Sequence, residues 1–465
     1  MKFSSPLWTS PELRAATKGV LTTECDITGV SIDTRTLQKN DLFIALKGDH
    51  SDGHRFIRQA LEQGAGAVMA HDNSALEAQK LQNDPRILLV SDTMKGLEEL
   101  GRFARQRFKG KAIAISGSVG KTTTKEMLRH ALAPHGKVHA SVASFNNHWG
   151  VPLTLARLPR DADFCINEIG MNHTGEIAPL VAQVRPDCAI ITAIGTAHLG
   201  LMGSHEAIAH EKASLFAGLN PEHSFALMPD NTGYEELARH YLPSHALLWL
   251  VGFSGEATIH IENPVLSDTG SRFHLHIRQK TISVTLTLPG LHHIRNAALT
   301  LGCIAGLGLE LEPSVQALKN FAPDRGRGAT VCLGKDITLI DESYNASSDS
   351  IRAALKTLAL RPATRRIAAL GDMLELGEFA RSEHESLAPD ICACEALCFC
   401  CGPHMKALFE SLPPELKGGY AENSTGLIPL IAETLHPGDI LLVKGSLGSQ
   451  MKKLIEGLET TFRHH

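Results

Sequence analysis

The segment G-S-V-G-K-T-T, residues 117–123, restricts the fold more than any other part of the sequence. It follows the apolar run KAIAIS at 111–116 and precedes the helical run TTTKEMLRHALA. A glycine loop between a buried strand and a helix lets backbone N–H groups close around phosphate oxygens at the positive end of the helix. The segment therefore predicts a phosphate-binding loop, and with it a parallel sheet covered by helices on both faces.

Each position of this loop has an expected role. Lys121 is expected to meet the β- and γ-phosphate charge, and the Thr122 hydroxyl to hold Mg²⁺. The strict eight-position pattern would place glycine where Ile115 stands, so the loop is a shortened version. The loop predicts ATP and Mg²⁺ as cofactors but leaves a kinase, a switch and a motor open. The residues expected to contact the nucleotide here are Gly117, Ser118, Val119, Gly120, Lys121, Thr122 and Thr123.

The chain is too long for one ordinary core, and its pattern predicts an α/β protein of three domains. Residues 1–91 contain short β-rich runs (VSIDT, LFIAL, AVMA) around a helical stretch, which indicates a small α/β domain. Residues 92–320 contain the loop and further strand–glycine–helix units, and are expected to form a central P-loop domain with a parallel sheet. Between about 257 and 288 the apolar period becomes two, which indicates antiparallel strands. Residues 321–465 alternate strands and helices, which predicts a Rossmann-like C-terminal domain.

Composition excludes several classes of function. The sequence is 43% hydrophobic and 20% charged with a net charge of −5, which fits a soluble protein and gives no reason to expect a nucleic-acid partner. The first residues lack the apolar core of a signal peptide, and no stretch approaches the roughly 20 apolar residues of a membrane span. We therefore expect a cytoplasmic protein that is not a membrane protein.

Five of the ten cysteines crowd the segment ICACEALCFCC, residues 391–401. A metal cluster is conceivable, but the spacing lacks the paired C-x-x-C form of structural zinc sites. The segment is instead typical of a helix end that enters an apolar strand, where cysteine serves as a small buried residue.

Three further residues follow predicted strands or lie in a nearby helix. Glu168 ends the strand FCINEIG, His198 follows AIITAIGTAH, and Lys212 lies in the helical run HEAIAHEKASLFAGL. In a doubly wound sheet such positions converge on the carboxyl edge beside the phosphate loop, where a carboxylate can hold magnesium. For an isolated His or Lys, a surface or capping role is the alternative.

Several motifs together resemble a known family. G-S-V-G-K-T-T, F-N-N-H-W-G-V-P, N-E-I-G-M-N-H-T-G-E-I, A-H-L and E-K-A-S-L-F are similar to the central domain of the Mur ligases, which add amino acids to the peptidoglycan precursor. D-E-S-Y-N-A-S-S-D-S, L-G-D-M-L-E-L-G and L-V-K-G-S resemble the members that act on UDP-N-acetylmuramoyl-tripeptide and D-alanyl-D-alanine. V-S-I-D-T-R and L-F-I-A-L-K-G-D are similar to the UDP-substrate domain. The resemblance covers nearly the whole chain, in the family's order.

The resemblance implies an ATP-dependent ligase that works through an acyl phosphate. By the family pattern, Lys121, Glu168, His198 and Lys212 are catalytic. Thr122 and Glu168 hold one Mg²⁺, His198 helps to hold a second, and Lys212 joins them if it is carbamoylated.

Other positions are implied to bind the nucleotide or the substrates. Asn296, Arg327 and Asp341 match nucleotide-side positions, and a turn or capping role is the alternative for each. The matching substrate positions are Ser31, Thr34, Arg35, Lys47, Asn146, Asn147, Tyr344, Asn345 and Lys444.

The chain also departs from the family at three positions. The family usually has Asn at His293, an acidic residue at His148 and often Arg at Leu447. The departure at Leu447 leaves the dipeptide side less defined. The alternatives are another Mur-type or folylpolyglutamate-type ligase, or a P-loop ATPase that forms no amide. The protein is expected to be a monomer.

Overall fold

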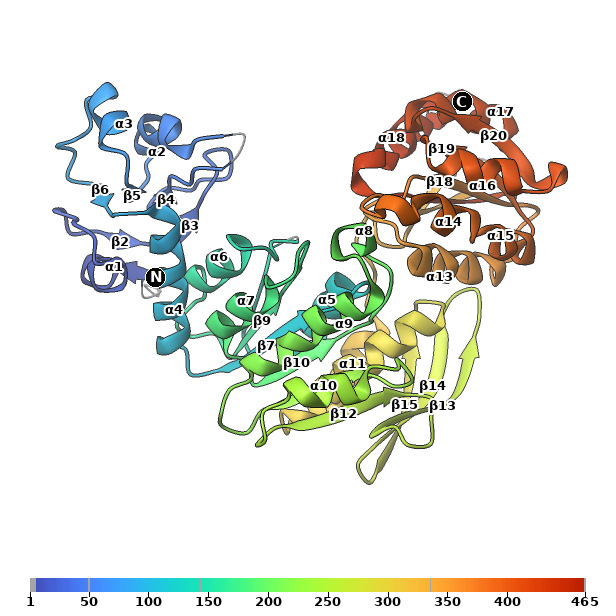
Figure 1. Cartoon of the computed structure of the whole chain (residues 1–465), viewed down its shortest axis with the longest axis horizontal. Helices are drawn as coiled ribbons and strands as arrows, with labels where there is room; N and C mark the ends of the chain where they lie inside the picture. The colour runs from blue at the N-terminus through green and yellow to red at the C-terminus, as the bar shows by residue number, and fades with distance from the viewer. Residues whose placement is uncertain (1–5, 49–50, 143, 335, 464–465) are drawn as a thin grey trace.

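The computed structural model describes residues 6–48, 51–142, 144–334 and 336–463. Figure 1 shows three lobes: the N-terminal part at upper left, the C-terminal part at upper right, and the central part below and between them. The described strands form sheets of two, four, nine and six strands. Each of the three larger sheets lies inside one predicted domain range, whereas the boundaries at 91 and 320 stay predictions.

The N-terminal domain is built on a parallel sheet of order β3-β4-β5-β6. The predicted runs VSIDT and LFIAL overlap β3 and β4, and AVMA coincides with β5, as expected from their β-branched and apolar residues. A two-stranded antiparallel pair, β1-β2, lies beside it. The elements are β1 (Trp8–Thr9), α1 (Ser10–Thr17), β2 (Asp26–Ile27), β3 (Gly29–Ser31), β4 (Asp41–Ile44), η1 (Gly53–Phe56), α2 (Ile57–Glu62), β5 (Ala67–Ala70), α3 (Asn73–Ala78) and β6 (Ile87–Leu89).

Helix α4 (Thr93–Arg107) connects this domain to the central one. It packs on α1 and on α6 (Gly150–Ala156), and its apolar face is buried in the N-terminal core. Trp8 Nε1 donates to the Ala156 carbonyl at 2.8 Å, and Arg157 Nε donates to the Val30 carbonyl at 2.7 Å. These contacts attach the first domain to the end of α6.

The central domain is organised around a nine-stranded sheet of order β15-β14-β13-β12-β11-β10-β7-β9-β8 among the described strands. Strands β7 to β13 pair in parallel, and β13, β14 and β15 pair antiparallel, so both predicted patterns are confirmed. The strands are β7 (Lys111–Ser116), β8 (Val138–Ala140), β9 (Phe164–Glu168), β10 (Cys188–Ile191), β11 (Phe225–Pro229), β12 (Leu247–Gly252), β13 (Ile259–Leu266), β14 (Ser271–Ile277) and β15 (Lys280–Leu286).

Helices cover both faces of this sheet. Ala112 and Ala114 of β7 face one apolar core with α6 and α7, while Ile113 and Ile115 face another with α5 and α11. Because β7 is buried on both faces, it reads as a continuous apolar run. Besides α6, the helices are α5 (Lys121–Leu132), η2 (Ala133–His135), α7 (Ile177–Val184), α8 (Leu199–Met202), α9 (His205–Ala213), η3 (Ser214–Gly218), α10 (Glu235–Tyr241), α11 (Leu291–Gly306) and α12 (Leu311–Lys319).

The C-terminal domain has a six-stranded sheet of order β16-β17-β21-β18-β19-β20 among the described strands. Only β16 is antiparallel, so the doubly wound unit that the sequence predicts is confirmed. The elements are β16 (Ala329–Gly334), β17 (Ile337–Glu342), α13 (Ser348–Ala359), β18 (Arg366–Gly371), η4 (Gly377–Phe379), α14 (Ala380–Glu385), α15 (Ala388–Cys394), β19 (Ala396–Cys401), α16 (Met405–Ser411), η5 (Pro414–Leu416), β20 (Lys417–Ala421), η6 (Ser424–Gly426), α17 (Leu427–Thr434), β21 (Ile440–Lys444), η7 (Leu447–Ser449) and α18 (Met451–Arg463).

The cysteine-rich segment is the end of α15 followed by β19, as predicted. Cys398, Cys400 and Cys401 are buried in the strand, and the Sγ atoms of the first two lie 3.6 Å apart. Burial raises the pKa of the Cys401 thiol to about 12. Within the described residues, no three His, Cys, Asp or Glu side chains are grouped to hold a metal ion. None of the described helices is long and apolar enough to cross a membrane.

Candidate functional site

The phosphate loop lies between β7 and α5, at the carboxyl edge of the central sheet. Gly117 and Gly120 have φ values of +149° and +85°, which L side chains rarely adopt. A Cβ on Gly117 would lie 2.1 Å from Thr192 Oγ1, so no larger residue fits there. The loop therefore combines glycine-specific backbone conformations with the N-terminus of α5, an arrangement typical of an anion-binding site.

Lys121, the first residue of α5, folds back over the loop. Its Nζ donates to the Gly117 carbonyl at 2.7 Å. Burial lowers the pKa of this lysine, Glu168 opposes the shift, and Arg327 adds to it. The ammonium is thus held inside the loop, close to an acidic side chain from the next strand.

Glu168 is the centre of a polar cluster at the end of β9. Only 1% of it is exposed. Its Oε2 accepts from Thr122 Oγ1 at 2.9 Å, and its Oε1 accepts from Asn146 Nδ2 at 2.9 Å. Lys125 Nζ lies 3.9 Å from Oε2 and donates to the Ser141 carbonyl at 2.9 Å. The sequence did not single out Lys125, because one lysine four residues after another gives no sign of burial.

The donor set of this cluster fits magnesium. The Thr122 hydroxyl and the Glu168 carboxylate are hard oxygen donors within hydrogen-bonding distance of each other. Magnesium sites in proteins typically use one or two such groups and take their remaining ligands from phosphates and water. The two residues predicted to hold the first metal ion are therefore brought together.

Lys212 lies in α9 and is 1% exposed. Burial, reinforced by the like charge of Lys121, places the pKa of its ammonium well below the ordinary value, and Glu211 opposes the shift. Glu211 accepts from the backbone N–H groups of Gly175 and Ile177, each at 2.7 Å. The lowered pKa raises the fraction of neutral amine, which is the form that reacts with carbon dioxide.

His198 precedes α8 and points toward the C-terminal domain. Its Nδ1 lies 2.5 Å from Glu375 Oε2. The close contact with His198 lowers the pKa of that carboxyl group, although burial opposes the shift. Among the described residues, neither His198 nor Lys212 makes a hydrogen bond or ion pair with Thr122 or Glu168. The two other predicted metal ligands are thus not joined to the first pair here.

Asn296, which is predicted to lie on the adenine side of the nucleotide, lies against the phosphate loop. Asn296 of α11 is 6% exposed, and a Cβ on Gly120 would lie 3.0 Å from its Oδ1. One turn earlier, His293 is 9% exposed and its Nδ1 has no hydrogen-bond partner among the described atoms. Burial, together with His292, places the pKa of His293 well below its ordinary value. A neutral, buried imidazole therefore occupies this position of α11.

Arg327 lies beside the start of α5, in a small hollow also lined by Thr122 and Thr123. Its guanidinium carbon is 3.9 Å from the centre of the Tyr344 ring, and its Nη2 donates to Ser144 Oγ at 3.0 Å. Two predicted residues of the C-terminal side, Arg327 and Tyr344, are therefore stacked next to the phosphate loop.

Other predicted residues of the C-terminal domain contact one another rather than the loop. Lys444 Nζ donates to Glu342 Oε2 at 2.9 Å and to the Asn345 carbonyl at 3.1 Å. Asp341 Oδ1 accepts from the hydroxyl and the backbone N–H of Ser343, at 2.6 and 3.1 Å. These groups stabilise the loop after β17.

The predicted UDP-side residues lie at the end of β3 or follow β3 and β4, whose parallel pairing places them at one edge of the N-terminal sheet. Ser31 is buried and donates to the Asp33 carbonyl at 2.9 Å, while Arg35 pairs with Asp33 at 2.6 Å. Thr34 is half-buried and Lys47 is exposed. Among the described residues, none of these four contacts the central site. Asn147 instead accepts from Gly150 N at 3.0 Å, at the start of α6.

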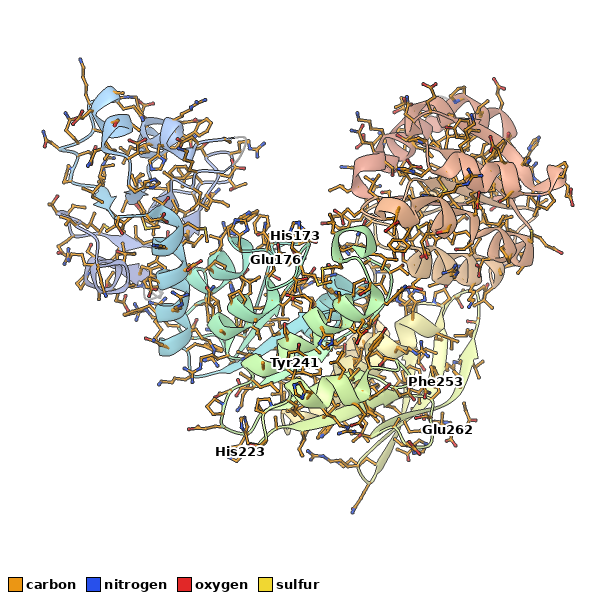
Figure 2. All side chains as sticks on the ribbon, in the orientation of Figure 1. His173, Glu176, His223, Tyr241, Phe253 and Glu262 are labelled. Atoms are coloured by element: carbon orange, nitrogen blue, oxygen red, sulfur yellow. The ribbon has the colours of Figure 1, made fainter. Side chains whose placement is uncertain are left out.

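Figure 2 shows the upper surface of the central domain. His173 and Glu176, paired at 3.0 Å, stand on the upper surface of this domain, facing the space between the two outer lobes. The conserved geometry of parallel sheets places Glu168 and the phosphate loop on the same carboxyl edge.

Comparison with known proteins agrees with this architecture. Residues 26–106 match the family described as "Mur ligase family, catalytic domain", residues 115–304 match "Mur ligase middle domain", and residues 326–447 match "Mur ligase, glutamate ligase domain". Each matched range contains one of the three larger sheets or most of it.

Individual relatives match along almost the whole chain. UDP-N-acetylmuramoyl-tripeptide–D-alanyl-D-alanine ligases from Synechocystis and Rickettsia prowazekii are 34% and 31% identical, over 94% and 97% of this chain and 93% and 99% of theirs. A crystal structure of MurF from Acinetobacter baumannii superposes with a TM-score of 0.87 at 28% identity, covering 97% of this chain and 99% of that one. The chain therefore belongs to the Mur ligase family, and the relatives that it resembles from end to end are the ligases of that family that add D-alanyl-D-alanine.

Proposed function

We propose that this chain is the ligase that joins D-alanyl-D-alanine to UDP-N-acetylmuramoyl-tripeptide at the expense of ATP. The observation that carries the proposal is the contact between Thr122 and Glu168 beside a phosphate loop, in a chain similar end to end to ligases of that name. The product is the UDP-muramoyl-pentapeptide of peptidoglycan synthesis.

In the first step, a carboxylate oxygen of the tripeptide attacks the γ-phosphorus of ATP. A new C–O–P linkage forms, the bond to the β-phosphate oxygen breaks, and ADP leaves. Both reactants are anions, so their approach requires fixed positive charge. The loop backbone and Lys121 supply that charge, and Lys121 is already held over Gly117.

Thr122 and Glu168 are proposed to hold Mg²⁺, which when bound neutralises phosphate charge. His198 and Lys212 are proposed to complete a second site, Lys212 after carbamoylation of its neutral amine. A carbamate would replace a repulsive ammonium by an oxygen anion. The low pKa of the buried Lys212 supports this proposal.

In the second step, the amine of D-alanyl-D-alanine attacks the acyl carbon. The new C–N bond forms, the bond to the phosphate oxygen breaks, and inorganic phosphate leaves while the amine loses a proton. Tyr344, Asn345 and Lys444 are proposed to face the dipeptide or the acyl phosphate. Exclusion of water by the C-terminal domain would protect the acyl phosphate from hydrolysis.

The remaining substrate contacts follow the same reasoning. Asn296, Arg327 and Asp341 are proposed to contact ATP, and Arg327 already lies in the hollow beside Thr122. Asn146 and Asn147 are proposed for the tripeptide end of the acceptor. The cationic and hydroxyl groups suited to a uridine diphosphate are Ser31, Thr34, Arg35 and Lys47.

We also propose that the enzyme acts as a monomer in the cytoplasm. Both ATP and a UDP-linked precursor are cytoplasmic metabolites, which supports this location. The monomeric state is tested by light scattering after size-exclusion chromatography.

The proposed function is tested by product analysis. The protein is incubated with ATP, Mg²⁺, UDP-muramoyl-tripeptide and D-alanyl-D-alanine, and the pentapeptide is sought by mass spectrometry. Formation of the pentapeptide with one phosphate released per amide supports the proposal. Phosphate release that needs no dipeptide and forms no amide would identify an ATPase instead, and product with a single amino acid would identify another Mur-type ligase.

A further inference from the structure

Two loops meet at the contact between the central and C-terminal domains, and each presents one strained residue. His198 follows β10 with φ +67°, and Glu375 follows β18 with φ +65°. For residues other than glycine this left-handed conformation costs roughly 1–2 kcal/mol. The two residues face each other, with His198 Nδ1 2.5 Å from Glu375 Oε2. Strained backbone of this kind persists where the surrounding structure requires it.

The backbones of the two loops also touch. Gly200 N donates to the Glu375 carbonyl at 3.0 Å. A Cβ on Gly200 would lie 2.3 Å from Gly377 N, so a side chain there would push the loops apart. The glycines thus bring the carboxylate of Glu375 to a fixed place beside the imidazole of His198.

The rest of the domain contact holds this arrangement. Leu199 and Met202 of α8 share one buried apolar cluster with Met373 and Leu376 of the β18 loop. Figure 1 shows α8 beside the C-terminal lobe. The contact between the two loops is therefore a packed interface.

A second polar contact lies beside the apolar cluster. Thr196 Oγ1 lies 2.9 Å from Ser348 Oγ, and Thr196 N donates to Asp349 Oδ2 at 3.3 Å. Both residues of the C-terminal domain belong to the first turn of α13. The interface therefore joins the β10 loop to two different elements of that domain.

The distance between Nδ1 and Oε2 determines which ring nitrogen of His198 carries the proton. The two atoms lie 2.5 Å apart without the alignment of a hydrogen bond. At this distance a lone pair on Nδ1 would repel those of the carboxylate, so the contact favours a proton on Nδ1. With the proton on the Nδ1 side, the neutral imidazole has its lone pair on Nε2, which is the form that binds metal ions. Metal-binding histidines characteristically donate their other nitrogen to a carboxylate, which fixes the ring orientation.

We propose that Glu375 is a positioning residue for His198: it holds the imidazole with Nε2 available for a divalent cation, and so makes the second metal site depend on the position of the C-terminal domain. The inference rests on the proposed function, in which His198 helps to hold a metal ion. It adds that a carboxylate from one domain orients a ligand from another. Opening of the C-terminal domain would then release the imidazole and weaken the metal site.

The test compares three variants. Glu375→Ala removes the acceptor, Glu375→Gln keeps an acceptor without the charge, and Glu378→Ala changes a neighbouring exposed acid in η4 as the matched control. Binding of Mn²⁺ in the presence of ADP is measured by electron paramagnetic resonance, and the His198 tautomer by ¹⁵N NMR of the metal-free protein. Thermal unfolding confirms that each variant folds.

The expected results follow from the geometry. Glu375→Ala should weaken Mn²⁺ binding about 10- to 100-fold and shift His198 toward the Nε2–H tautomer. Glu375→Gln should lie between Glu375→Ala and wild type, and Glu378→Ala should match wild type. Unchanged Mn²⁺ affinity together with an unchanged tautomer would overturn the proposal. So would tighter binding in Glu375→Ala, because Glu375 would then sequester His198 from the metal.

These readouts are separate from the reaction. If the wild-type protein forms no pentapeptide but Mn²⁺ affinity falls in Glu375→Ala, the positioning role stands and the proposed function fails. If the pentapeptide forms and Mn²⁺ affinity does not respond to Glu375→Ala, the proposed function stands and the positioning role fails.

Discussion

Thr122 and Glu168 are joined by a 2.9 Å hydrogen bond between the first turn of α5 and the end of β9. The register of the sheet pairs Glu168 with Ile115, two residues before the phosphate loop begins at Gly117. The carboxylate and the hydroxyl thereby meet, although 46 residues of sequence separate them.

The Thr122 hydroxyl can be removed while the shape of the side chain is kept. We expect Thr122→Val to lower kcat/KM for pentapeptide formation at least about 100-fold, since this loses a buried hydroxyl that donates to Glu168 and is proposed to hold the metal ion. Thr122→Ser, which keeps the hydroxyl, should retain most of the activity. Steady-state kinetics at several Mg²⁺ concentrations measures both. Equal losses in the two variants would show that the methyl group, not the hydroxyl, matters.

Lys212 provides a second prediction. Because this buried amine has a depressed pKa, we expect it to be carbamoylated and Lys212→Ala to lose nearly all turnover. Short carboxylic acids such as acetate should restore part of the activity by occupying the space of the carbamate. The rate is measured with and without acetate, and Lys212→Arg serves as a control that keeps the charge but cannot be rescued. Full activity of Lys212→Ala would refute the idea.

A substitution at Gly120 tests the contact between the phosphate loop and Asn296. Gly120→Ala places a Cβ 3.0 Å from Asn296 Oδ1 at φ +85°, so we expect weaker ATP binding and a stability loss of roughly 1 kcal/mol or more. Gly308→Ala is a matched control, because its φ is +77° and no atom lies within 4 Å of the added Cβ. Calorimetric titration with ATP and urea unfolding should show a stability loss in both variants but an affinity loss only in Gly120→Ala.

The buried His293 makes stability depend on pH. Its pKa in the folded chain is well below the ordinary value, so the unfolded chain takes up a proton first as pH falls. The folded state is therefore favoured above the ordinary histidine pKa of about 6.5 and loses stability below it, by up to about 1.4 kcal/mol per pH unit. His292, whose pKa burial also lowers, adds to the same trend.

We expect His293→Asn to reduce the loss of unfolding free energy between pH 7 and pH 5.5, measured from urea titrations. His205→Asn is the control, since His205 is exposed at the start of α9. If the variant at His293 and wild type lose stability in parallel, the buried imidazole does not carry the effect.

Much of the fold follows from local sequence. The apolar run 111–116 became β7 with the same limits, and the alternation between 257 and 288 became β13 to β15. Such patterns are readable because burial on one or both faces imposes a fixed period on the side chains. Strand β20 was not predicted, because its residues KGGYA have neither an apolar period nor a high β propensity.

Some residues of the candidate site were likewise predicted from the sequence, and others were not. The loop at 117–123 and Glu168 at the end of a strand were predicted from sequence and resemblance, and the structure places them together. Lys125 was not predicted as part of the cluster, nor Glu375 as the partner of His198, which lies 177 positions earlier in the chain. The sequence by itself determined the strand, loop and helix that can bind phosphate, because local backbone geometry and burial set them. Only the tertiary structure decided which side chains from distant elements reach that loop, because sheet order and domain packing set those distances and leave no trace in local sequence.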